Sequence, residues 1–146
     1  ERALICFGGT DFTGVPHPDH VKLVGIVNYA AVFPLCRAVV HHGGSGTTAA
    51  SLRAGIPTLV LWSSADQPYW GAQVKRLKVG TSRRFSASTG ATLVTDLRRI
   101  VQPAYAERAR QLATRMTAPA QSAAAAADLF EDAVRRKSGA AAAKPR

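Results

Sequence analysis

The chain has 146 residues, the size of one domain, and 47% of them are hydrophobic, which is ordinary for a globular core. It carries 19 Lys and Arg residues against 9 Asp and Glu residues, so its net charge is +10 and anionic partners such as nucleotides, nucleic acid or acidic membrane surfaces are favoured. No apolar run approaches the length of a membrane-spanning helix. Two cysteines are too few for the disulfide framework of a small secreted domain.

Short strand-like runs alternate with helical patterns along the chain. The predicted strands are Ala3–Phe7, Val21–Val24, Ala38–Val40, Thr58–Trp62 and Thr81–Phe85. The predicted helices are Tyr29–Leu35, Thr47–Arg53, Gln67–Leu77, Thr92–Val101, Tyr105–Met116 and Gln121–Arg136. Because the strands are mostly apolar on both faces, we expect a parallel sheet with helices on both sides, which is a doubly wound, Rossmann-like α/β domain.

The end of the chain differs from the rest in composition. From Ser138 onward it consists mainly of alanine and basic residues and offers no core positions. Residues 1–137 are therefore predicted to form one domain and residues 138–146 a disordered basic tail. Cys6 and Cys36 lie in apolar, strand-like runs, so both are expected to be buried, reduced thiols.

A glycine-rich turn is the most informative segment. It follows a β-branched strand and opens an alanine-rich helix with the sequence His41-His42-Gly43-Gly44-Ser45-Gly46-Thr47. Such a turn directs free backbone N–H groups and the positive end of the helix dipole at one spot, which suits a phosphate or diphosphate, and imidazole N–H groups can donate to the same anion. The spacing matches neither the P-loop nor the dinucleotide fingerprint, and taken alone the segment could equally be a structural turn.

A second constellation lies where the fourth predicted strand meets the next helix. Asp66 accepts hydrogen bonds and Gln67 both donates and accepts them, a combination that suits the vicinal hydroxyls of a sugar. Taken alone, Asp66 is better explained as the N-cap of the following helix. Trp62 and Trp70 could flank a sugar, although core packing is the favoured role for Trp62.

Together these motifs resemble the donor-binding half of the GT-B glycosyltransferases that use nucleotide-activated sugars with inversion. The family pattern is a hydrophobic strand, H-x-G-G-x-G-T, a helix, G-x-P, a second strand and D-Q. This chain has the glycine-rich turn, Gly55-Ile56-Pro57 and Asp66-Gln67 in that order, and the likeness extends from about Ala3 to Val134. It is most similar to bacterial members that act on natural products, sterols and glycolipids.

The resemblance implies a role for each matching residue. His41 would be the catalytic group, donating to the diphosphate, and Asp66 and Gln67 would hold the sugar hydroxyls. Ile26 and Val27 would hold the base. His42 would be either a second donor or a core histidine. The remaining diphosphate-binding positions would be Gly43, Gly44, Ser45, Gly46 and Thr47. The implied reaction moves a hexosyl group from a nucleoside-diphosphate sugar with inversion, without a metal ion or other cofactor.

The same resemblance implies partners that this sequence does not contain. The family's general base lies in an N-terminal acceptor domain, and the first strand–helix unit of the donor domain is also expected to be missing. The chain alone is therefore expected to be inactive. Its acceptor would be a lipid or natural-product hydroxyl, its location cytoplasmic with a peripheral membrane contact, and no specific nucleic acid is expected. The alternatives are an epimerase-like GT-B protein and a basic nucleic-acid-binding module without enzymatic activity.

Overall fold

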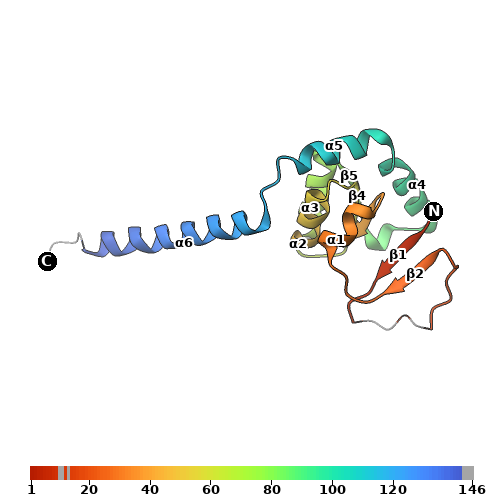
Figure 1. Cartoon of the computed structure of the whole chain (residues 1–146), viewed down its shortest axis with the longest axis horizontal. Helices are drawn as coiled ribbons and strands as arrows, with labels where there is room; N and C mark the ends of the chain where they lie inside the picture. Colours follow the sequence, from red (N-terminus) through yellow and green to blue (C-terminus); the bar gives the residue numbers. More distant parts are fainter. Residues whose placement is uncertain (10–11, 13, 143–146) are drawn as a thin grey trace. The chain divides into compact units, whose positions relative to one another are not determined.

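The computed structural model describes residues 1–9, 12 and 14–142, with side chains described up to residue 136 (Figure 1). The strands are β1 (Ala3–Cys6), β2 (Val21–Val24), β3 (Val39–His41), β4 (Thr58–Trp62) and β5 (Gly80–Arg84). The helices are α1 (Tyr29–Val32), α2 (Ser45–Arg53), α3 (Gln67–Arg76), α4 (Gly90–Ile100), α5 (Pro103–Ala113) and α6 (Pro119–Ala142), with 3-10 turns η1 (Phe33–Leu35) and η2 (Phe85–Ala87). Each predicted element is present, with small differences at its ends.

Three strands form the parallel sheet at the centre of the fold. Their order is β3-β4-β5, and the side chains of Leu59 and Val60 on the middle strand are fully buried. Neighbouring side chains on a strand point to opposite faces. Ser82 lies under α3 while Arg83 pairs with α4, so these two helices cover opposite faces of the sheet. This arrangement confirms the predicted Rossmann-like α/β class and places the ends of β3, β4 and β5 at one edge.

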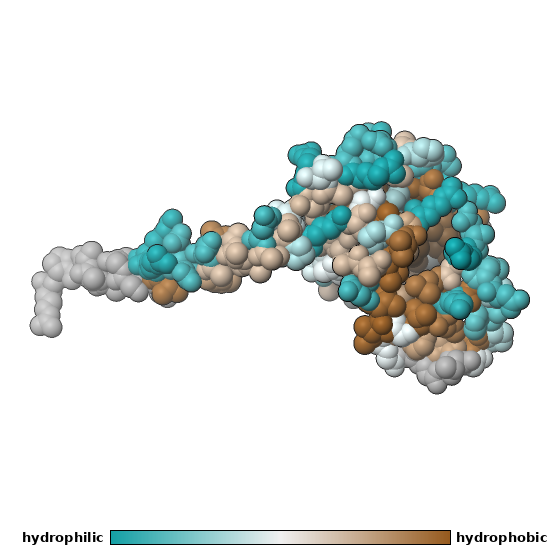
Figure 2. Space-filling view, viewed as in Figure 1, coloured by the Kyte–Doolittle hydropathy of each residue, from teal (hydrophilic) through white to brown (hydrophobic). Residues whose placement is uncertain are grey.

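The first two strands form a separate parallel sheet rather than extending the central one. All four residues of β1 are exposed, and Figure 2 shows apolar surface gathered in the region of β1 and β2. Parallel strands are usually joined by a helix that covers one face of the sheet. In the described part of the connection between residues 7 and 20 there is no helix, which explains why β1 is left uncovered.

Residue contacts divide the chain into two units, Glu1–Thr114 and Arg115–Arg146. The first unit thus ends at Thr114, whereas the sequence predicts a boundary after residue 137. The second unit holds α6, whose residues are exposed from Pro119 to Arg136. This helix continues to Ala142, past the start of the predicted disordered tail, because alanine favours helix. The rest of that predicted tail, residues 143–146, lies outside the described residues.

The two thiols are less enclosed than the sequence suggests. Cys6 is exposed and Cys36 is half-buried, and both are free. The prediction of burial is therefore wrong for Cys6, because β1 carries no covering helix. The Sγ of Cys36 donates a hydrogen bond to the carbonyl oxygen of Val32 at 3.4 Å. No helix in the described part of the chain is long and apolar enough to cross a membrane.

Candidate functional site

The glycine-rich turn joins the end of β3 to the start of α2, as predicted. Gly44 occupies the N-cap position of α2 and provides no side-chain hydrogen bond. The first N–H groups of a helix have no partner within the helix. The start of α2 therefore leaves backbone donors available to an acceptor from outside the helix.

Gly43 holds this turn against the neighbouring loop. Its φ is +95°, and a Cβ atom there would lie 2.6 Å from Cγ1 of Val60 and 3.3 Å from the carbonyl oxygen of Gln67. Both the backbone conformation and the close contact require glycine. The contact brings the predicted diphosphate-binding turn and the predicted sugar-binding residue Gln67 side by side.

Unlike Gly43, Gly46 is not required by the fold to be glycine. No atom lies within 4 Å of a Cβ placed on Gly46, and its φ is not positive. Glycine inside a helix is less stable than alanine by about 0.5–1 kcal/mol. Because glycine has no side chain, open space remains beside the first turn of α2. A ligand that approached the backbone closely would need this space.

His41 presents an unusual buried donor at this turn. Its Nδ1 accepts a hydrogen bond from the backbone N–H of Gly43 at 2.9 Å. In a neutral imidazole the other nitrogen, Nε2, must then carry the proton. Among the described residues nothing bonds to Nε2, although the atom is buried. A buried donor without a partner costs about 1–3 kcal/mol, so a ligand oxygen that reached Nε2 would relieve this cost.

The neutral form of His41 is strongly preferred. Burial, and to a lesser extent the neighbouring His42, lowers the pKa of His41 from 6.5 to about 4. At neutral pH the side chain therefore acts as an N–H donor without a positive charge.

A pH-dependent stability follows from this pKa. Between about pH 6.5 and about pH 4 the unfolded chain binds a proton at His41 and the folded chain does not, so the free energy of unfolding falls as the pH falls. The full effect is about 3 kcal/mol. In urea unfolding at pH 7 and pH 4.5, the wild-type chain should lose more stability than His41→Asn, which cannot titrate. Equal losses in both proteins would contradict the lowered pKa.

His42 does not belong to the core. It is exposed, and its Nε2 would lie 2.6 Å from a Cβ on Gly44, so the imidazole packs against the α-carbon of that glycine. The ring centroids of His41 and His42 are 6.4 Å apart. The core-histidine alternative is therefore wrong, while a role for His42 as a second donor stays a prediction.

Asp66 occupies the N-cap position of α3, as the interpretation of this residue alone predicts, but its carboxylate does not act as the cap. Its side chain makes no capping hydrogen bond. Instead, Oδ2 accepts a hydrogen bond from Nε1 of Trp70 at 2.7 Å. The carboxylate is exposed, so its other oxygen faces solvent and can accept a further donor.

Gln67 is oriented by the loop that precedes it. Its Oε1 accepts hydrogen bonds from the backbone N–H of Ser63 at 2.8 Å, from Oγ of Ser63 at 3.2 Å and from the backbone N–H of Ser64 at 3.2 Å. The carbonyl oxygen of the amide is thus occupied by the protein. Gln67 can offer a sugar only its NH₂ group, which narrows the predicted role to that of a donor.

Two supporting contacts were not predicted. Trp70 fixes Asp66, and Ser63 fixes Gln67. Both pairs are four residues apart. For Asp66 and Trp70, at the start of α3, this spacing is the helical one that brings side chains together and is a signal in the sequence, whereas Ser63 lies in the loop before the helix.

The predicted base-binding residues follow β2. Ile26 is 93% exposed and Val27 is half-buried. The next residue, Asn28, caps α1, and its Oδ1 accepts a hydrogen bond from the backbone N–H of Ala30 at 3.0 Å. Helix α1 in turn contacts α2. The structure thus connects this loop to the helix that begins at the glycine-rich turn.

The loop that follows β1 has the sequence Gly8-Gly9-Thr10. Gly8 and Gly9 are exposed, and no atom lies within 4 Å of a Cβ placed on either. Thr10 lies outside the described residues. In the described part of the chain no three His, Cys, Asp or Glu side chains are grouped so that they could hold a metal ion.

Comparison with known proteins identifies relatives over nearly the whole chain. Residues 9–131 match the family described as erythromycin biosynthesis protein CIII-like, C-terminal domain. An uncharacterized glycosyltransferase of Mycobacterium tuberculosis is 65% identical over 136 residues, which cover 93% of this chain and 33% of the relative. A sterol 3-β-glucosyltransferase of Arabidopsis thaliana is 43% identical over 83 residues, covering 56% of this chain and 13% of that protein.

Solved structures agree with these matches. The crystal structure of the glycosyltransferase VinC in complex with dTDP superposes with a TM-score of 0.64 and 29% identity, covering 68% of this chain and 26% of VinC. The chain spans about a third of the length of the mycobacterial relatives that it matches.

Proposed function

We propose that this chain, which belongs to the family of erythromycin biosynthesis protein CIII-like C-terminal domains and thus to the C-terminal domains of GT-B glycosyltransferases, binds the nucleoside diphosphate of a sugar donor. One observation carries the proposal: the buried Nε2–H of His41 has no partner among the described residues and lies at the turn that opens α2. A diphosphate oxygen would satisfy that donor and the uncapped N–H groups of the helix together. The similarity to VinC, which was crystallised in complex with dTDP, supports the same ligand class.

The two halves of the site divide the donor between them. His41, His42 and the turn from Gly43 to Thr47 would bind the diphosphate, and Asp66 and Gln67 would bind the sugar. Gly43 packs directly against Gln67, so the two halves are adjacent, as a diphosphate and its attached sugar require. Ile26 and Val27 would contact the base from the loop that leads into α1.

The proposed reaction is transfer of the sugar to a hydroxyl group with inversion at the anomeric carbon. Negative charge develops on the departing diphosphate, and the N–H groups of His41 and α2 would stabilise it. These fixed donors would take the role that a metal ion has in other transferases, so the proposal assigns no metal to the site. The acceptor would be a lipid or natural-product hydroxyl, a class supported by the name of the Arabidopsis relative. The base that deprotonates this hydroxyl would come from an acceptor domain.

Nucleotide titration tests the proposed function. We expect UDP or dTDP to shift backbone NMR signals of Gly43 to Thr48 in this chain, and His41→Ala to reduce these shifts. Arbitrary duplex DNA should not displace the nucleotide at physiological salt. If neither nucleotide perturbed the turn at millimolar concentration, the proposal would fail.

Gly46→Ala separates ligand binding from folding. The added methyl group meets no protein atom, so stability should stay the same or rise by up to about 1 kcal/mol. The same methyl group would project where the diphosphate approaches the helix, so affinity for the nucleotide should fall about 10-fold. Calorimetric binding and urea unfolding of the same variant measure the two effects. Unchanged nucleotide affinity would place the ligand elsewhere.

A further inference from the structure

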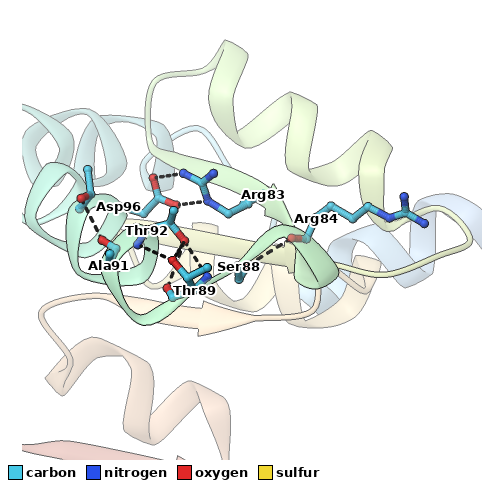
Figure 3. A network of polar contacts seen from close by, with 8 residues as sticks. Arg83, Arg84, Ser88, Thr89, Ala91, Thr92 and Asp96 are labelled. Carbon is cyan, nitrogen blue, oxygen red and sulfur yellow. Dashed lines mark hydrogen bonds and ion pairs between the residues drawn. The ribbon is translucent and has the colours of Figure 1, made fainter.

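Strand β5 ends in two consecutive arginines with different surroundings. Arg83 forms a two-pronged ion pair with Asp96, with Nε and Nη2 at 2.8 and 3.2 Å from the two carboxylate oxygens. Figure 3 shows Arg83 directed at Asp96 and the Arg84 side chain directed away from that network. Among the described residues no carboxylate forms an ion pair with Arg84, which is exposed. The positive charge of Arg84 is therefore not neutralised by the protein.

The indole ring of Trp62 positions the guanidinium group of Arg84. The Arg84 guanidinium lies 5.9 Å from the centre of the Trp62 ring, within the range of a cation–π contact. Trp62 is the last residue of β4 and is paired in register with Arg84. The indole is itself fixed by α3, since a Cβ on Gly71 would lie 3.5 Å from its Cδ1. The charge is thus positioned at the edge where the parallel strands end.

The same edge carries the residues proposed to bind the sugar. Trp62 is followed directly by Ser63, whose backbone N–H and hydroxyl donate to Gln67. Contacts therefore run from Arg84 through Trp62 and Ser63 to Gln67. The nearby carboxylate of Asp66 is bonded to Trp70, and no acidic residue occurs from Gln67 to Thr95. Because Asp96 is paired with Arg83, Arg84 is left without a carboxylate partner among the described residues and can receive a negative group.

We propose that Arg84, held by Trp62, binds a carboxylate on the transferred sugar, so that the site prefers a nucleotide-activated uronic acid over the corresponding neutral hexose. This inference rests on the proposed function, because it takes Asp66 and Gln67 as the sugar-binding residues. The sugar is favoured over the acceptor as the source of the carboxylate because Trp62 leads without interruption into the loop that fixes Gln67. A guanidinium suits a carboxylate because its planar N–H groups match the two oxygens.

The test compares two donors that differ only in this group. UDP-glucuronate and UDP-glucose, or the matching dTDP sugars if dTDP is the nucleotide bound, are titrated into this chain and followed by NMR. We expect the uronate to bind up to about 5-fold more tightly, the upper end of the range for an exposed charge pair. Arg84→Gln should remove the preference and Arg84→Lys should retain part of it. Arg76→Gln, which removes the same charge at the far end of α3, should leave the preference intact.

The possible outcomes distinguish a failure of the role assigned to Arg84 from a failure of the proposed donor site. Equal affinity for the two sugars, or a preference that persists in Arg84→Gln, would overturn the role of Arg84 while nucleotide binding stood. Failure of UDP, dTDP and both sugars to bind would instead reject the donor site itself. Trp62→Leu, checked for folding by circular dichroism, should weaken the preference because the guanidinium loses its support.

Discussion

Replacing His41 with alanine should slow sugar transfer about 100- to 1,000-fold in an enzyme that joins this chain to an acceptor domain, the range found for removal of one fixed donor to a developing negative charge. The reason is geometric. Nδ1 is occupied by the N–H of Gly43, so Nε2 carries the proton, and this N–H group is buried without a partner among the described residues. Because burial lowers its pKa to about 4, the imidazole is a neutral donor at neutral pH.

The measurement is steady-state transfer with the donor varied, in parallel with nucleotide affinity of the separate chain. The loss should appear in kcat more than in KM if His41 acts mainly on the charge of the departing diphosphate. His42→Ala is the matched control, because that imidazole is exposed and lies against Gly44. It should cost less than His41→Ala. Equal losses in the two variants, or unchanged transfer in His41→Ala, would contradict the assignment.

The order of elements could be predicted from the sequence because glycine and proline mark their ends. Gly55, with φ of +69°, ends α2, and Pro103 begins α5. The three-strand sheet follows from the same pattern. The exposure of β1 could not be predicted, because an apolar run shows that a strand can be buried and not that another element will cover it. For the same reason, the sequence does not show that β1 and β2 form a sheet separate from the central one.

The candidate site could be predicted by residue type but not by orientation. His41 and His42 are adjacent in the sequence, and only the structure shows that the first is half-buried and the second exposed. An aspartate before a helix predicts a cap, yet the Asp66 carboxylate turns to Trp70. Gln67 similarly gives its oxygen to Ser63 and Ser64. These choices depend on side-chain rotamers and on competition between nearby donors, which residue spacing alone does not determine.

Gly80→Ala should destabilise the fold by about 3 kcal/mol or more, at the upper end of the cost of overpacking a core. Gly80 begins β5 and is buried beside β4. A Cβ at this position would overlap the carbonyl oxygen of Thr58 and lie 2.7 Å from Cγ1 of Val74. The first obstacle is backbone in the central strand, which cannot move without breaking the pairing of β4 with β5.

Urea unfolding of Gly80→Ala against Gly90→Ala measures this cost. Both substitutions add one methyl group at a glycine that starts an element, but no atom lies within 4 Å of a Cβ on Gly90, so that variant should stay within about 0.5 kcal/mol of the wild type. If Gly80→Ala were as stable as the control, β4 and β5 could not be as closely packed as described. The edge that positions Trp62 beside Arg84 depends on the same pairing, so the donor preference assigned to Arg84 would lose its structural basis as well.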